Sequence, residues 1–133
     1  MTKINILTLL TAVVVQFVIG YLWYGPHLFG DVMTSSGHGI DFLKLDIVSL
    51  LLIVLGSYGL TSILDSIINL THTKDMNGVI KTGVMVGVFG IGLPIIMLLN
   101  LLGLSHVALL VIFTHIVLVT TLTGVVVLKL KKT

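Results

Sequence analysis

The sequence predicts an all-α integral membrane protein in which residues 1–133 form one domain, a four-transmembrane-helix bundle with both termini on the cytoplasmic side. Composition is the first reason. The mean hydropathy is +1.22, 56% of residues are hydrophobic and 9% are charged, against about 25% charged in soluble domains. The second reason is four apolar runs, each long enough to cross about 30 Å of hydrocarbon as a helix: Ile4–Tyr24, Ile47–Leu70, Val79–Leu102 and Val107–Leu128.

The first run is expected to be a retained helix and not a cleaved signal peptide, because aromatic residues follow it where a small-residue cleavage site would lie. It ends at Gly25–Pro26, since proline cannot continue the helical hydrogen bonds. The longest loop, Gly25–Lys44, follows, and its middle, Phe29–Met33, is expected to form a short turn at the membrane surface. Asp46 is the expected N-cap of the second helix.

The remaining helices are joined by the short polar loop Thr71–Gly78 and by a tight turn at Gly103–Ser105, and Pro94 is expected to kink the third helix. Small residues recur at helical spacing on two of the runs, a pattern that lets helix backbones approach closely in lipid. These faces are expected to pack the helices of one subunit, and the alternative is that one face forms a homo-oligomer. The glycines concerned are Gly56, Gly59, Gly83, Gly87 and Gly90.

The distribution of charge predicts the orientation. With four spans, every lysine except Lys44 falls on the side of the two termini, whereas Asp31, Asp41 and Asp46 share the side of Lys44. The positive-inside rule then places the termini in the cytoplasm, as expected of a multi-pass protein of the inner (plasma) membrane. The lipid bilayer is the expected partner. The net charge of +2 does not indicate nucleic acid binding.

Polar residues within the spans are the candidate site. Asp65 lies about 9 Å inside the cytoplasmic boundary and Lys81 begins the next helix, so the two are expected to form an ion pair, with a cation or proton site as the alternative. Gln16 and His115 lie at similar depth near mid-membrane. With Ser57 and Thr114 they form either a polar cavity or an interhelical hydrogen bond between amide and imidazole.

The chain shows no catalytic set, because no Ser-His-Asp order, paired carboxylates or phosphate-binding glycine loop stands out. It has no cysteine, which excludes thiolate chemistry. A non-enzymatic protein without cofactor or metal is therefore expected. The outer loop is the only place where histidines and aspartates could gather around a metal, through His27, Asp31, His38 and Asp41.

The segment Leu22-Trp23-Tyr24-Gly25-Pro26-His27-Leu28-Phe29-Gly30 ends the first apolar run. It resembles the Leu-Trp-Tyr-x-Pro-x-Leu-Phe-Gly motif of the uncharacterised membrane-protein family called domain of unknown function 1761. The resemblance implies four spans and no known activity. It draws attention to an aromatic anchor, a helix stop and a turn at the outer interface, made by Trp23, Tyr24, Pro26, Phe29 and Gly30.

Two functions remain after these exclusions. The first is a small oligomeric transporter or channel-like protein, which needs a hydrated interior at Gln16 and His115. The second is an accessory or scaffold subunit of a larger membrane complex, or a lipid-binding membrane protein, which needs dry contacts along its glycine faces. We prefer the first, because intramembrane polar residues commonly mark a pathway.

Overall fold

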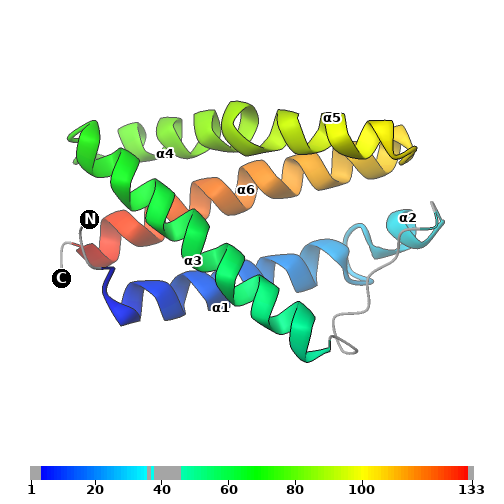
Figure 1. Ribbon diagram of the computed structural model, residues 1–133, viewed down its shortest axis with the longest axis horizontal. Helices are drawn as coiled ribbons and strands as arrows, with labels where there is room; N and C mark the ends of the chain where they lie inside the picture. Colours follow the sequence, from blue (N-terminus) through cyan, green and yellow to red (C-terminus); the bar gives the residue numbers. More distant parts are fainter. Residues whose placement is uncertain (1–3, 36, 38–45, 132–133) are drawn as a thin grey trace.

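A computed structural model describes residues 4–35, 37 and 46–131 (Figure 1). The regular secondary structure of these residues is helical, with no strand among them. Four helical stretches are long and apolar enough to cross a membrane: α1 (Ile6–Tyr24), α3 (Ile47–Leu70), Met76–Leu101 and α6 (His106–Lys131). The predicted all-α class and its four apolar helices are confirmed. Part of the sequence prediction falls outside the described residues, at Lys3, His38, Asp41, Lys44 and Lys132.

Polar caps set where the helices begin. The Asp46 carboxylate accepts a hydrogen bond from the Ser49 backbone N–H at 2.8 Å, as predicted for an N-cap. Hydrogen bonds from Ser49 hold the pKa of the Asp46 carboxyl below its usual value. Asp75 caps α4 (Met76–Met85) through Gly78 in the same way. The third span therefore begins at Met76 and not at Val79, because the helix extends past the apolar run to its cap.

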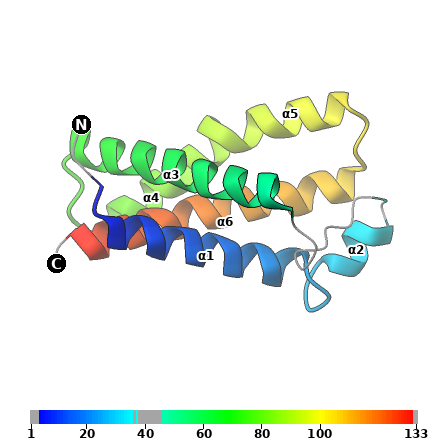
Figure 2. The same ribbon diagram turned by 60° about the horizontal axis from the view of Figure 1, so that its bottom comes forward.

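The third span is not a continuous α-helix. α4 is followed by a π-helical segment, Val86–Gly92, and then by α5 (Leu93–Leu101). The Leu93 N–H bonds to the carbonyl of Val88, five residues back, as in a π-helix. The irregularity lies directly before Pro94, which has no N–H to continue the regular ladder. Beyond it α5 is set apart from α6 in Figure 2.

α6 is the central helix, with contacts to α1, α3 and all three parts of the third span. α3 crosses α1 and α6 diagonally (Figure 1). The beginning of α1 and the end of α6 lie at one end of the bundle, together with the α3–α4 turn. The short helix α2 (Gly30–Ser35) lies at the other end, near the α5–α6 turn, and it overlaps the short turn predicted at Phe29–Met33.

The core has two apolar clusters with a polar layer between them. Tyr24, Met33, Ala108 and Val111 form the cluster near α2, and Ile68, Val79, Val127 and Leu128 form the one near the chain ends. Between them the buried polar side chains are hydroxyls: Ser57, Thr61, Thr120 and Thr123. The Thr61 and Thr120 hydroxyls donate to carbonyls one turn back on their own helices, whereas Ser57 and Thr123 bond to Gln16 of α1.

Candidate functional site

A cavity of about 470 Å³ opens between α1, α3 and α6, in the half of the bundle nearer α2. This volume is within the range of about 300–1,000 Å³ usual for small-molecule pockets. Apolar side chains form most of the wall. The structure brings together three of the four residues predicted to form a polar cavity: Gln16, Ser57 and His115. The lining residues are Gln16, Phe17, Gly20, Ser49, Leu52, Ile53, Gly56, Ser57, His115 and Val119.

Gln16 closes the inner end of the cavity by joining three helices. Ser57 Oγ of α3 donates to Gln16 Oε1 at 2.8 Å, and Gln16 Nε2 donates to Thr123 Oγ1 of α6 at 3.1 Å. The cavity lining does not extend past this chain, and the buried Thr61 and Leu64 fill the next turns of α3. The hydrogen-bonded chain is therefore the limit of the cavity toward the chain ends.

His115 presents one ring nitrogen with a partner and one without. Tyr24 Oη lies 3.1 Å from His115 Nδ1, and the two rings meet edge to face with centroids 4.8 Å apart. His115 Nε2 is buried and has no hydrogen-bond partner among the described residues. Buried polar atoms are normally satisfied, so this nitrogen is an exception that a function of the cavity could explain. The expected direct bond between Gln16 and His115 is not formed, since each side chain bonds elsewhere.

Thr114 does not belong to the cavity, which corrects the prediction made for it. It is exposed, and its hydroxyl donates to Leu110 and Val111 on its own helix. Neighbouring helix residues point about 100° apart, so residues at equal depth need not share a face. Spacing by four gives the correct face, because Val119 and Thr123 follow His115 at that interval. Thr123 could have been found from this pattern.

The segment that carries the family resemblance folds the end of α1 against the start of α6. Trp23 Nε1 donates to the Val111 carbonyl at 3.0 Å, and its ring packs 4.9 Å from that of Phe29. Gly30 follows Pro26 in a tight turn, where a Cβ would lie 2.4 Å from the Gly25 carbonyl oxygen. Tyr24 continues this arrangement to His115. The segment thus positions the histidine as well as anchoring the helix end.

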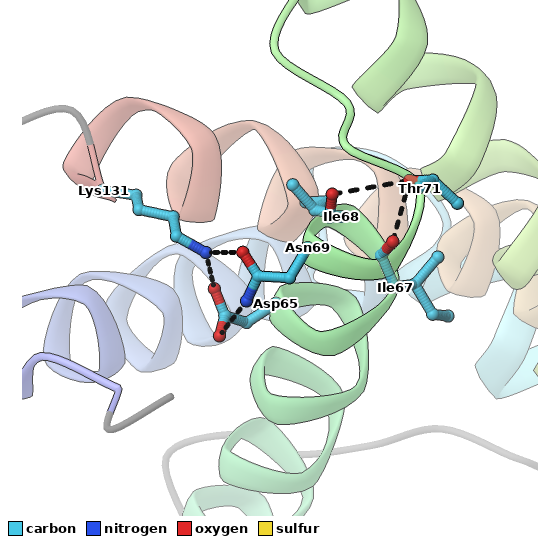
Figure 3. A network of polar contacts seen from close by, with 6 residues as sticks. All are labelled: Asp65, Ile67, Ile68, Asn69, Thr71 and Lys131. Atoms are coloured by element: carbon cyan, nitrogen blue, oxygen red, sulfur yellow. Dashed lines mark hydrogen bonds and ion pairs between the residues drawn. The ribbon is translucent and has the colours of Figure 1, made fainter. Parts of the chain in front are cut away.

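Asp65 pairs with Lys131 and not with Lys81, which corrects the predicted ion pair. Lys131 Nζ lies 2.9 Å from Asp65 Oδ1 and also donates to Asn69 Oδ1, while Asn69 Nδ2 donates to Asp65 Oδ2 at 3.2 Å (Figure 3). Lys81 is exposed on α4. A short loop makes α3 and α4 sequence neighbours, but the end of α6 lies on the face of α3 that carries Asp65.

Only part of the predicted glycine packing occurs within the chain. A Cβ at Gly83 would lie 2.6 Å from Thr121 Cα, and one at Gly87 2.9 Å from Val117 Cα, so α4 and α6 touch through their backbones. At Gly56 and Gly59 a Cβ would meet no described atom within 4 Å, and at Gly90 it would meet only Val86. These three do not pack helices of one subunit. A homo-oligomer through α3 stays a prediction.

The described part of the outer loop gathers no metal site, since no three histidine or acidic residues lie close together within residues 4–35, 37 and 46–131. Comparison of the chain with protein-family models, with curated proteins and with solved structures finds no match. The family resemblance of the Leu22–Gly30 segment therefore stays a prediction.

Proposed function

We propose that this chain is an integral membrane protein with four spans. Its surface supports this, because large apolar side chains are exposed along every long helix, as at Ile47 (74%), Leu70 (79%) and Leu101 (83%). A soluble monomer rarely exposes contiguous apolar surface on this scale. The 24 residues of α3 rise about 36 Å, enough to cross the hydrocarbon layer.

The proposed orientation places the chain ends in the cytoplasm, with the protein in the plasma membrane. Lys74, Lys81, Lys129 and Lys131 lie on the helix ends or turn at that end of the bundle. The opposite end carries acidic residues, at the start of α2 and of α3. This distribution agrees with the positive-inside rule.

Within that membrane the proposed role is non-enzymatic: a small transporter or channel-like protein whose cavity takes a small ligand. The observation that carries this proposal is that His115, a residue of the cavity wall, has a buried Nε2 without a partner among the described residues. Phe17, Leu52 and Ile53 offer an apolar wall, so the cavity fits an amphiphilic molecule with one hydrogen-bonding group near the histidine.

The neutral imidazole can serve a ligand in either tautomer. If Tyr24 donates to Nδ1, then Nε2 carries the proton and donates to the ligand; if Nδ1 donates to Tyr24, then Nε2 accepts. Passage to the other side requires the Ser57–Gln16–Thr123 chain to open, because it closes the inner end. During transport by this route, the side chains of Ser57, Gln16 and Thr123 exchange their hydrogen bonds to one another for hydrogen bonds to water or ligand. We propose that transport occurs in an oligomer, since the cavity described for one chain ends at these hydrogen bonds.

The closed inner end also favours a second function. A cavity that ends at satisfied hydrogen bonds can hold a lipid or small amphiphile without passing it on. In that case the chain is a lipid-binding protein or an accessory subunit of a larger complex, and the open Gly56–Gly59 face of α3 is available to a partner.

Cysteine labelling tests whether water reaches the cavity. The chain has no cysteine, so single substitutions need no other change. Gly56 lines the cavity and Gly59 does not, yet both accept a Cβ without meeting a described atom within 4 Å. In liposomes, a water-soluble methanethiosulfonate reagent should modify Gly56→Cys at least about tenfold faster than Gly59→Cys, because only a hydrated thiol forms the reactive thiolate. Equal, slow labelling would show a dry cavity and favour the accessory role.

Flux measurements test transport itself. Liposomes containing the protein and a trapped pH-sensitive dye should dissipate an imposed pH gradient faster than empty liposomes. His115→Phe keeps a planar ring but removes the ring nitrogens, and it should lower this flux about tenfold, the effect of losing one hydrogen bond to the transported species. Thr114→Val is the control, because Thr114 lies outside the cavity. If the intact protein carries no proton flux while Gly56→Cys is labelled, proton transport is overturned and the ligand-holding role is favoured.

A further inference from the structure

A second hollow lies at the end of the bundle where the described chain begins and ends. Its volume is about 470 Å³, and it is formed by the last turn of α3, the turn that follows and the last turns of α6. None of its residues belongs to the cavity around His115. The lining residues are Ile68, Asn69, His72, Thr73, Lys74, Leu128 and Lys131.

The hollow is apolar at its base and rich in hydrogen-bond donors at its rim. Ile68 and Leu128, which belong to the apolar cluster of the core, are 3% and 5% exposed. The rim carries the ammonium groups of Lys74 and Lys131 and the imidazole of His72. An apolar base below a cationic rim matches the boundary between the acyl chains and the phosphate of a phospholipid.

Lys131 is held in place at this rim. Its ammonium donates to Asp65 Oδ1 at 2.9 Å and to Asn69 Oδ1, which uses two of its three N–H groups (Figure 3). The third is left for a ligand. That N–H group can donate to one oxygen of a phosphodiester, which carries a single negative charge.

His72 occupies a backbone position that normally takes glycine. Its φ is 51°, and the N–H groups of His72 and Thr73 bond back to Asn69 and Ile68 at 3.2 and 3.1 Å, which forms a Schellman motif at the end of α3. The equivalent turn after α5 uses Gly103, with φ 85°. A histidine in this left-handed conformation is unusual, and it places the imidazole at the rim of the hollow.

We propose that this hollow binds the phosphodiester of an anionic phospholipid in the leaflet beside the chain ends. The proposal rests on the membrane insertion proposed above but not on transport, since the site is separate from the His115 cavity. α3 and α6 both end at this hollow, so their dipoles place negative partial charge there, and the attraction for a phosphate comes from the lysine and histidine side chains of the rim. Lys131 and His72 bind the phosphate oxygens, and the apolar base receives the start of the acyl chains.

The test measures lipid binding by the full chain in micelles of a neutral detergent. Native mass spectrometry follows a titration with short-chain phosphatidylglycerol, and inorganic phosphate is titrated in parallel. The intact protein should bind one phosphatidylglycerol per chain, and Lys131→Met and His72→Gly should each weaken binding about tenfold. Lys81→Met is the matched control, because this lysine lies at the same end but outside the hollow.

His72→Gly keeps the test independent of folding, because glycine adopts the left-handed turn without penalty and only the imidazole is lost. Unchanged affinity in both variants, or an equal loss in Lys81→Met, would overturn the site. Inorganic phosphate that binds as tightly as the lipid would overturn the lipid assignment in favour of free phosphate. Gly56→Cys labelling reports on the other cavity. The lipid-binding result can therefore be interpreted even if the transport proposal fails.

Discussion

Replacing Gly83 with alanine is expected to lower the free energy of unfolding by about 1–3 kcal/mol, the range found for overpacked contacts. The added Cβ would lie 2.6 Å from Thr121 Cα and 3.3 Å from its backbone nitrogen. Backbone atoms cannot move aside as a flexible side chain can, so α4 and α6 must separate. The measurement is unfolding in mixed micelles with increasing denaturing detergent, followed by circular dichroism.

Gly59→Ala is the matched control for this prediction. It adds the same Cβ to a helix interior, but in open space among the described residues. Alanine favours a helix over glycine by up to about 1 kcal/mol, so this variant should be as stable as the parent protein or more stable. Equal destabilisation by both substitutions would show that α4 and α6 are not in backbone contact.

Replacing Gln16 with leucine is expected to destabilise the protein by about 1–3 kcal/mol. The amide makes one hydrogen bond to Ser57 and one to Thr123, and so connects α1, α3 and α6. Hydrogen bonds between membrane helices contribute about 0.6 kcal/mol on average and at most about 1.7 kcal/mol each. Leucine has a similar volume, so lost hydrogen bonding and not a new void dominates the change. The same detergent titration measures it.

Thr114→Val provides the comparison. Thr114 also lies within a span, but its hydroxyl bonds only to carbonyls of α6 and its side chain is exposed. Valine has nearly the same shape, so the free energy of unfolding should change by less than about 0.5 kcal/mol. A loss in Thr114→Val as large as that in Gln16→Leu would contradict the placement of the polar layer between α1, α3 and α6.

Hydropathy was sufficient to predict the helices but not all of their ends. The second run, Ile47–Leu70, matches α3 residue for residue. The fourth run ends at Leu128 whereas α6 continues to Lys131, and the third span begins at Met76 in place of Val79. An apolar run in the sequence corresponds to the part of a helix that lies in the hydrocarbon layer. Where the helix extends beyond the run to polar residues, as in the third and fourth spans, hydropathy misses those ends. The first run instead begins at Ile4, two residues before α1, because Asn5 is the N-cap.

The partners of the polar side chains were harder to predict, because depth along a helix is independent of the direction in which a residue points. Gln16, Ser57 and His115 share a depth and a cavity, whereas Thr114 shares only the depth. The short loop between the second and third spans likewise led to the wrong partner for Asp65. The adjacent helix in sequence carries Lys81, but the helix that faces the carboxylate is α6, which is far away in the chain.

The glycine face of the third span could be predicted only in part from the sequence. Regular helical spacing groups Gly83 and Gly87 with Gly90. In the structure the face continues at Gly92, where a Cβ would lie 2.9 Å from the Phe113 ring. Five residues separate Gly87 from Gly92, which is the spacing of the intervening π-helical segment. Without a signal for that segment, the sequence alone could not identify Gly92.

The widened turn of the third span also bears on how this protein can vary in length. A π-bulge holds about one residue more than the α-helical turn it replaces, while the helices on either side keep their faces. Removing one residue between Gly87 and Gly92 would restore four-residue spacing and leave Gly92 directed at Phe113. Relatives of this chain that differ by a single insertion or deletion would therefore be accommodated here, inside a span, where helices otherwise tolerate such changes least.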